Sequence, residues 1–351
     1  MMLAETYEVD DATGNGWHMM LGDSCERLAE IPDESVHLGV HSPPFPSVYT
    51  YSGSLRDLGN AETFPEFMEH YRFVVDELYR VHKPGRIHCV LVQQVAAKKA
   101  VHGYVGLIDF RGDVIREWQR AGWIYYGEVT IPKQPQAQAI RMKISALTFA
   151  TLERDSSQTR PALADYMLIF RKPGDNAEPV KPEVDRPTWI RWANTEWDPA
   201  DEHGHTDSIE QAAYLDTIWR DKVGDGATLN KSGSRDDDDE RHICPLQLPV
   251  IERCIRLWSN RGETVLSPFA GIGSEGHEAV RFGRRFVGIE LKRSYWQAAV
   301  KHLAAAETKI VPPAGVSMYP AELIEVPGWR ERAERKAELA SLRAQQLDLL
   351  R

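Results

Sequence analysis

A strand, a glycine-rich loop, a helix and a second strand follow one another late in this 351-residue chain. Residues 264–266 form a short β-type run, and the loop after it carries Gly271, Gly273 and Gly276 as a helical pattern begins at 274–282. A second β-type run at 285–289 ends in Glu290. This order is typical of a nucleotide-binding βαβ unit, where glycines let a ligand approach the backbone and an acidic group accepts hydrogen bonds from ribose hydroxyls.

The late position of this unit constrains the rest of the fold. Only about 60 residues follow it, which is too few for the remainder of such a sheet, so the other strands must precede it. Five earlier β-type runs alternate with helical patterns or turns, at 17–21, 36–40, 87–93, 123–131 and 165–170. We therefore expect an α/β fold with a permuted, seven-stranded, mostly parallel Rossmann-like sheet and helices on both faces.

The composition changes along the chain and suggests four regions. Residues 173–240 are rich in Pro, Asp and Gly with isolated Trp residues, and they end in the acidic run 236–240. This composition predicts a loop-rich insert rather than a continuation of the sheet. We expect residues 1–172 and 241–310 to form the two halves of the main domain, and 311–351 to form a charged helical tail.

The strand at 36–40 leads directly into Ser42-Pro43-Pro44-Phe45, at the sheet edge where α/β enzymes bind substrates. Two adjacent prolines fix the backbone and leave carbonyl groups as pure acceptors. Ser42 Oγ and the Pro43 carbonyl could hold both hydrogens of an aromatic amine and direct its lone pair at a methyl donor. Phe45 could stack on a base that has rotated out of a duplex. Taken alone, the segment also fits a proline-rich turn without chemistry.

The charge balance argues mildly against a polyanionic partner. The chain has 42 Lys and Arg against 52 Asp and Glu, a net charge of -10. The charges are uneven, however, because residues 131–172 hold seven basic and three acidic side chains. The polar stretch 154–160 and the pair Lys98 and Lys99 could therefore contact phosphates, although an ordinary surface loop and a solvated helix face explain them as well.

The apolar runs, the cysteines and the histidines of the sequence indicate where the protein acts and whether it binds a metal. No apolar run is long enough to cross a bilayer and residues 1–10 lack a secretory pattern, so we expect a soluble, cytoplasmic protein that does not contact membranes. The four cysteines are scattered, which predicts neither a disulfide framework nor a zinc site. His203 and His205 have no partners at metal-ligand spacing, so we expect no metal.

Taken together, the segments resemble the DNA methyltransferases that modify exocyclic amines. The resemblance is carried by Leu21-Gly22-Asp23, the Ser-Val-x-Leu pattern at 35–38, the Ser42 segment, the glycine loop at 267–276, and Glu290. The catalytic segment comes first and the cofactor loop last, as in the beta group of that family. The likeness covers roughly residues 17–172 and 241–303.

The resemblance implies S-adenosyl-L-methionine as cofactor and double-stranded DNA as partner. It implies that Ser42, Pro43, Pro44 and Phe45 are catalytic, and that the insert occupies the position of the target recognition region. It further implies a set of cofactor-binding residues: Asp23 at the adenine, Glu290 at the ribose, Phe269, Gly271 and Gly273 at the methionine part, Ser267 and Pro268 in the same loop, and Pro245 as a cover. Ser267 stands where the family often has Asp, and Ser274-Glu275 where it often has Thr.

The residue before the two prolines bears on the base that is modified. Family members acting on cytosine N4 tend to carry Ser-Pro-Pro with an aromatic residue, whereas those acting on adenine N6 tend to carry Asp or Asn there. Ser42 therefore favours site-specific methylation of cytosine N4 in a flipped-out base. The alternatives are an adenine N6 methyltransferase, an NAD-dependent oxidoreductase with the same glycine loop, and a DNA-binding protein that has lost catalysis.

Overall fold

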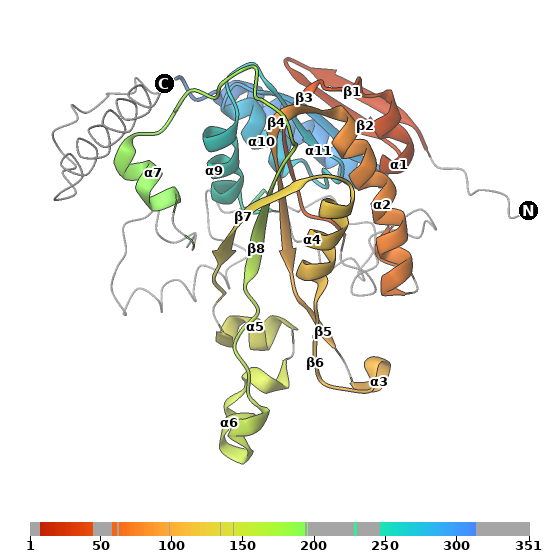
Figure 1. The fold of residues 1–351 in the computed structure, drawn as a ribbon, viewed down its shortest axis with the longest axis vertical. Coiled ribbons are helices and arrows are strands. Elements are labelled where there is room, and N and C mark those ends of the chain that lie inside the picture. Colours follow the sequence, from red (N-terminus) through yellow and green to blue (C-terminus); the bar gives the residue numbers. More distant parts are fainter. Residues whose placement is uncertain are drawn as a thin grey trace, which may run out of the picture.

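The computed structural model describes residues 8–44, 58–61, 63–97, 99–133, 135–142, 144–193, 195, 228–229 and 246–313. Its centre is an eight-stranded sheet in the order β1-β2-β10-β9-β3-β4-β8-β7 (Figure 1). The five middle strands are parallel: β2 (Trp17–Leu21), β10 (Arg285–Glu290), β9 (Thr264–Ser267), β3 (Val36–His41) and β4 (His82–Gln93). Antiparallel strands complete both sides: β1 (Asp10–Gly14), β8 (Asp165–Arg171) and β7 (Ile124–Ile131).

The permuted α/β sheet predicted from the sequence is confirmed, with all seven expected strands present. The eighth strand, β1, escaped prediction because its sequence DDATG has no apolar alternation. It lies at the edge of the sheet and leaves most of its side chains in solvent.

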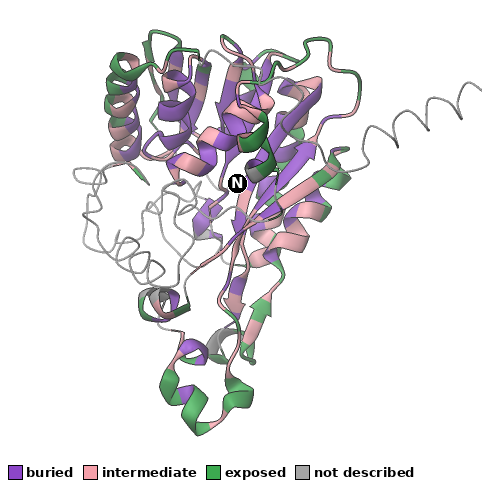
Figure 2. Ribbon diagram, turned by 90° about the vertical axis from the view of Figure 1, so that its left-hand side faces the viewer, coloured by how far each residue is buried: buried purple, intermediate pink, exposed green. Residues whose placement is uncertain are grey.

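Helices cover both faces of the sheet. On one face lie α1 (Ser24–Arg27), α2 (Phe64–Val81) and α4 (Phe110–Arg120), and on the other lie α9 (Leu248–Trp258), α10 (Ser274–Arg281) and α11 (Arg293–Ala306). Strand side chains alternate between the two cores, so that Met19 and Leu21 join one while Met20 joins the other. Figure 2 shows the strands and the inner helix surfaces as the buried part of the molecule.

Two excursions leave the sheet and project together from one end of the molecule (Figure 1). The first excursion, residues 94–109, follows β4 and contains β5 (Val95–Ala97), α3 (Lys99–His102) and β6 (Gly106–Ile108). The second excursion, residues 133–163, joins β7 to β8 and contains α5 (Pro135–Met142) and α6 (Phe149–Arg154). Short 3₁₀ turns occur in the second excursion and elsewhere, at Leu28–Glu30, Leu58–Asn60, Ser145–Leu147, Ser156–Gln158 and Glu307–Lys309.

The chain then crosses the opposite end of the sheet. Residues 176–183 lie against the start of the C-terminal half, where the Lys181 N–H donates to Asn260 Oδ1 over 2.8 Å and Arg284 pairs with Glu183 over 2.9 Å. The helix α7 (Arg186–Trp192) follows. Most of the predicted insert, the acidic run and the C-terminal tail lie outside the described residues. Within the described ranges, no helix is both long and apolar enough to span a membrane.

Candidate active site

The two sequence segments that carry the resemblance meet at one edge of the sheet. Strand β9 lies between β10 and β3, and Gly39 of β3 pairs with Leu266 of β9. Ser42 and Phe269 each stand three residues beyond this pair, and the rings of His41 and Phe269 lie 5.6 Å apart. The Ser42 segment and the glycine loop therefore share the carboxyl edge of adjacent parallel strands, although more than 200 residues separate them.

Ser42 is held in a defined orientation. It is half-buried, and its hydroxyl donates a hydrogen bond to the Leu91 carbonyl over 3.0 Å. Because a serine hydroxyl has one proton and two lone pairs, this bond uses the donor and leaves the oxygen as an acceptor. Pro43 is buried and Pro44 half-buried beside it, while Phe45 lies outside the described residues.

Glu290 is fixed at the end of β10 by the backbone around it. The Gly271 N–H donates to Oε2 over 2.8 Å, and the Lys292 N–H donates to Oε1 over 2.9 Å. The Gly22 N–H donates to the Glu290 carbonyl over 2.9 Å, which ties the ends of β2 and β10 together. Each carboxylate oxygen can accept a further bond, so the group is oriented for the hydroxyls of a ribose.

The glycines of the loop differ in their roles. Gly271 has a φ of +52°, and a Cβ built on it would meet nothing within 4 Å. Gly273 has a φ of +85°, and its Cβ would lie 2.8 Å from Leu303 and 3.0 Å from Ala299 of α11. Gly271 therefore turns the loop beside open space that a ligand can occupy, whereas Gly273 brings the loop against a helix.

Two further predicted residues can be located. Asp23 is half-buried at the end of β2, where its side chain accepts the Cys25 N–H over 2.9 Å and caps α1. Pro268 is buried, and its carbonyl accepts a hydrogen bond from the Ser24 hydroxyl. The predicted cofactor-binding residue Pro245 lies outside the described residues.

Three buried polar atoms near the glycine loop have no hydrogen-bond partner within the described part of the chain: Gln247 Oε1, Ser267 Oγ and Ser274 Oγ. Ser267 ends β9, Ser274 begins α10, and Gln247 precedes α9, which packs on α10. Buried polar groups are normally paired, so these atoms fit a ligand that brings its own donors and acceptors. The amino-acid end of S-adenosylmethionine has both, and the residues present therefore suit this cofactor.

Glu275 adds a carboxyl group to the first turn of α10. The residue is only 4% exposed. Burial, with a smaller contribution from the nearby Glu290 carboxylate, raises the pKa of Glu275 to about 8. The group is therefore largely protonated at neutral pH.

Three buried histidines form a ladder behind Ser42. His82 Nδ1 donates to the Leu78 carbonyl over 2.8 Å, so His82 Nε2 must accept, and it accepts from His88 Nδ1 over 3.2 Å. His88 Nε2 then accepts from His41 Nδ1 over 2.7 Å. This direction is self-consistent only for neutral rings, and burial lowers the pKa of His41 and His82 to about 3. Gly39 makes room for the ladder, because a Cβ there would lie 2.0 Å from the His88 ring.

The ladder ends at aromatic residues that support the site. His41 Nε2 accepts from the Tyr71 hydroxyl over 3.1 Å, and the Tyr71 oxygen accepts from Trp118 Nε1 over 3.1 Å. The Tyr71 ring stacks on Phe269 at 6.4 Å. The buried network thus fixes the strand end before Ser42 and one side of the glycine loop.

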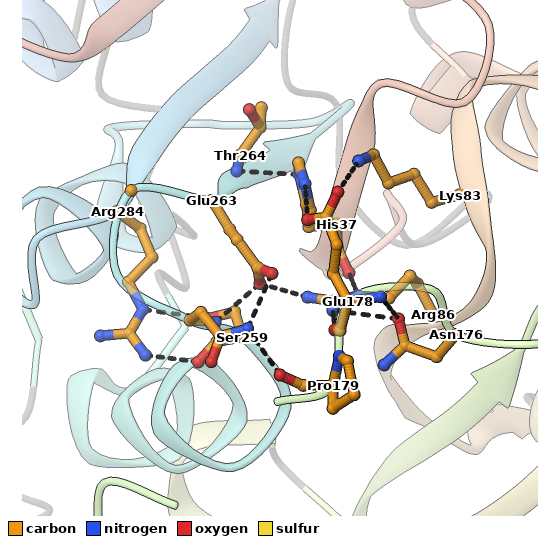
Figure 3. Close-up of polar contacts among 12 residues, drawn as sticks. His37, Lys83, Arg86, Asn176, Glu178, Pro179, Ser259, Glu263, Thr264 and Arg284 are labelled. Carbon is orange, nitrogen blue, oxygen red and sulfur yellow. Dashed lines mark hydrogen bonds and ion pairs between the residues drawn. The ribbon is translucent and has the colours of Figure 1, made fainter. Parts of the chain in front are cut away.

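A second polar cluster lies at the opposite edge of the sheet, at the starts of β3 and β9 (Figure 3). His37, Glu178 and Glu263 place ligand-type atoms within 4.8 Å of one another. However, His37 Nδ1 accepts the Thr264 N–H over 3.2 Å, so Nε2 carries the proton of the neutral ring and has no lone pair for a metal. Glu263 already pairs with the buried Arg86. The cluster is therefore an internal ion-pair network.

Sequence reasoning missed several residues that shape the site. His41 and Tyr71 were given no role at the site because they belong to largely apolar patterns, which predict core packing, and Glu275 was noted only as a departure from the family's loop. A histidine directly before the Ser-Pro-Pro segment and a carboxylate directly after the loop glycines were the available signals.

A parallel sheet with a glycine loop after one central strand and a ribose-type carboxylate after the next defines a class of nucleotide-dependent α/β enzymes. The unpaired polar atoms around the loop and the Ser42 segment beside it fit the S-adenosylmethionine-dependent methyltransferases within this class. Comparison with known proteins gives the family. The chain belongs to the DNA methylase family N6_N4_Mtase, whose model matches residues 36–301.

Individual relatives agree with this membership. The type II methyltransferase M.MjaI of Methanocaldococcus jannaschii is 26% identical over 310 residues, covering 81% of this chain and 89% of its own. A DNA modification methylase from Thermus thermophilus, solved with S-adenosyl-L-methionine, has a TM-score of 0.54 at 23% identity, covering 82% and 94% of the two chains. The PvuII DNA methyltransferase, described as cytosine-N4-specific, has a TM-score of 0.53 at 16% identity, covering 85% and 93%.

The protein is therefore an S-adenosylmethionine-dependent DNA methyltransferase. The predicted cofactor and enzyme class are confirmed. Membership of this family excludes the alternative of an NAD-dependent oxidoreductase.

Proposed function

We propose that the enzyme methylates the exocyclic N4 amine of cytosine in double-stranded DNA. The observation that carries this proposal is the hydrogen bond from Ser42 Oγ to the Leu91 carbonyl, which leaves the serine oxygen as an acceptor for an amine hydrogen. The Ser-Pro-Pro segment is the form that resembles cytosine N4 methyltransferases. The structural relative described as cytosine-N4-specific has the same fold.

Each residue of the Ser42 segment has a separate role in the proposed reaction. Ser42 Oγ and the Pro43 carbonyl hold the two amine hydrogens, Pro44 keeps the turn rigid, and Phe45 stacks on the extruded base. S-adenosylmethionine supplies an electrophilic methyl carbon. The amine lone pair forms the N–C bond while the electron pair of the C–S bond goes to sulfur, and the methylated nitrogen then loses one proton to water.

In this proposal the cofactor is held at the same edge of the sheet as Ser42, by the ends of β2, β9 and β10. Glu290 accepts the ribose hydroxyls, and Asp23 lies at the adenine. Phe269, Gly271 and Gly273 line the methionine part of the pocket, with Ser267 and Pro268 in the same loop and Pro245 covering it. The backbone bonds that fix Glu290 support its part in this assignment, because a carboxylate that is already oriented loses little entropy on binding.

The test is methyl transfer from labelled S-adenosylmethionine to mixed-sequence duplex DNA, followed by nucleoside analysis. We expect label in N4-methylcytosine. Label in N6-methyladenine alone would show that the other amine is the substrate, and no label in either nucleoside would contradict the proposal as a whole.

A serine pair provides the matched variants. Ser42→Ala should lower kcat by roughly 10²-fold, the effect of removing one preorganised polar contact, while affinity for S-adenosylmethionine stays near the wild-type value. Ser35→Ala is the control, because Ser35 is also half-buried and donates to a backbone carbonyl, that of Pro32 at 2.7 Å, but at the other end of β3. Equal activity of the two variants would remove Ser42 from the site.

A further inference from the structure

The second excursion, residues 133–163, begins at the edge of the sheet that carries Ser42. It links the end of β7 to the start of β8, where Ile131 pairs with Asp165. Asp165 in turn pairs with Gln93 of β4, two residues beyond the Leu91 carbonyl that binds Ser42. The excursion therefore continues the surface on which the catalytic segment lies.

The base of this excursion is firmly attached. Gln93 Nε2 donates to Asp165 Oδ1 over 2.8 Å and to the Leu163 carbonyl over 3.3 Å. Gln138 of α5 makes two bonds to Leu163, at 2.8 and 2.7 Å. Lys133 pairs with Asp165 over 2.5 Å. An element anchored in this way has a fixed position relative to the catalytic edge.

The surface of the excursion is unusual for this acidic protein. Residues 133–163 hold five basic and two acidic side chains, whereas the whole chain has a net charge of -10. The two excursions also carry six of the large apolar side chains that are exposed among the described residues: Tyr104, Val105, Leu107, Ile140, Phe149 and Leu152. Figure 2 shows the projecting end as largely exposed.

Two arginines on the excursion have no carboxylate partner within the described residues. Arg154, exposed in the last turn of α6, contacts only Gln158 Oε1 at 3.3 Å. The adjacent Asp155 forms no ion pair with Arg154, and its carboxylate instead accepts bonds from the Ser157 N–H and hydroxyl and from Gln158 Nε2. Glu153 is exposed beside it without an ion pair to either arginine.

Arg160 differs from Arg154 in its burial. It is half-buried, and its guanidinium donates to the Pro161 carbonyl over 3.1 Å. Burial lowers the pKa of Arg160 because no opposite charge compensates the lost hydration. A cation desolvated in this way is suited to an anion that arrives with a partner molecule.

We propose that the second excursion binds the phosphate backbone of the DNA duplex beside the target base, and that Arg154 and Arg160 make the phosphate contacts. This inference rests on the proposed function, because it assumes that duplex DNA approaches the Ser42 edge. Arginine matches phosphate geometry and charge, and such contacts fix the register of a duplex without reading its sequence. DNA binding by this enzyme then depends on residues outside the predicted recognition insert at 173–240.

Salt-dependent binding of a short labelled duplex of mixed sequence tests this proposal. Arg154→Ala and Arg160→Ala should each reduce the slope of log affinity against log salt by about 0.9, and the double variant by about twice that amount. Arg154→Lys should restore most of the slope, since lysine keeps the charge. The KM for DNA should rise several-fold, while kcat and the affinity for S-adenosylmethionine stay unchanged.

Arg285→Ala is the matched control. Arg285 is exposed and makes no ion pair within the described residues, and its side chain donates to the Gly262 carbonyl over 2.9 Å, but it stands at the start of β10, at the opposite edge of the sheet. Thermal unfolding verifies that each variant is folded. If Arg160→Ala does not fold, the salt slopes of Arg154→Ala and Arg154→Lys still test whether the excursion contacts phosphates.

The outcomes separate the two proposals. Wild-type salt slopes in the alanine variants would overturn the phosphate contacts even if the enzyme methylates cytosine. A wild-type protein that does not bind the duplex would overturn them as well. If sedimentation shows that the variants change self-association and not DNA affinity, the excursion is a surface for a second copy of the chain. Transfer to adenine, by contrast, contradicts only the base assignment.

Discussion

At the scale of single residues, the site is defined by groups whose hydrogen-bonding options are already restricted. Ser42 has its donor occupied by Leu91, and the Glu290 oxygens are oriented by two backbone N–H groups. His41 is held neutral with one ring nitrogen donating and the other accepting. Such restriction lowers the reorganisation needed when a ligand binds, which is how a positioned acceptor contributes to catalysis.

Glu275 gives a pH prediction at this scale. Its pKa is about 8 in the folded protein against an ordinary 4.5, so the unfolded chain loses this proton first as the pH rises. The stabilising contribution is thus complete below about pH 4.5 and is lost progressively as the pH rises toward 8. Glu275→Gln should remove this loss, so that the variant gains stability relative to wild type across that window.

Denaturant unfolding at several pH values measures this effect. Glu153→Gln changes an exposed carboxylate and serves as the control. Parallel pH dependences for wild type and Glu275→Gln would contradict the prediction.

At the scale of elements, the loop between β9 and α10 separates a ligand-facing glycine from a packing glycine. Gly271→Ala places a Cβ in open space at positive φ and should cost roughly 1 kcal/mol of stability, the usual penalty of the left-handed region. Gly273→Ala adds an overlap with Leu303 and Ala299 and should cost about 2–4 kcal/mol.

Three variants distinguish these roles by unfolding and by calorimetry with S-adenosylmethionine. Gly127→Ala is the control, because Gly127 has an ordinary φ and open space around its Cα. We expect Gly271→Ala to stay folded but lose cofactor affinity. A stability loss larger at Gly271 than at Gly273 would argue against this division of roles.

At the scale of the whole molecule, the permuted order requires that the two ends of the domain be joined firmly. Arg86 of β4 donates to the His37 carbonyl over 3.0 Å and to the Glu178 carbonyl over 2.9 Å, and it pairs with Glu263 before β9. The side chains of Arg86 and Glu263 are 2% and 8% exposed. This network connects the N-terminal strands, the segment after β8 and the C-terminal half.

Arg86→Met should therefore lower the free energy of unfolding by about 3–5 kcal/mol, because it leaves the Glu263 charge buried without a partner. The double variant Arg86→Met with Glu263→Gln should recover part of that loss. Arg116→Met, which removes a pair in which the arginine is 64% exposed, should change stability by less than about 1 kcal/mol. Equal effects of Arg86→Met and Arg116→Met in chemical unfolding would mean that the cluster does not join the two halves.

The sequence by itself determined the α/β class, the seven predicted strands, the permuted order and the two segments that meet at the site. These features are local, since periodicity and glycine spacing are set by residues close together in the chain. The edge strand β1, the histidine ladder, the Leu91 partner of Ser42 and the unpaired state of Arg154 and Arg160 came only from the tertiary structure. Each depends on which distant groups lie within hydrogen-bond or ion-pair distance, and packing of the whole chain decides that.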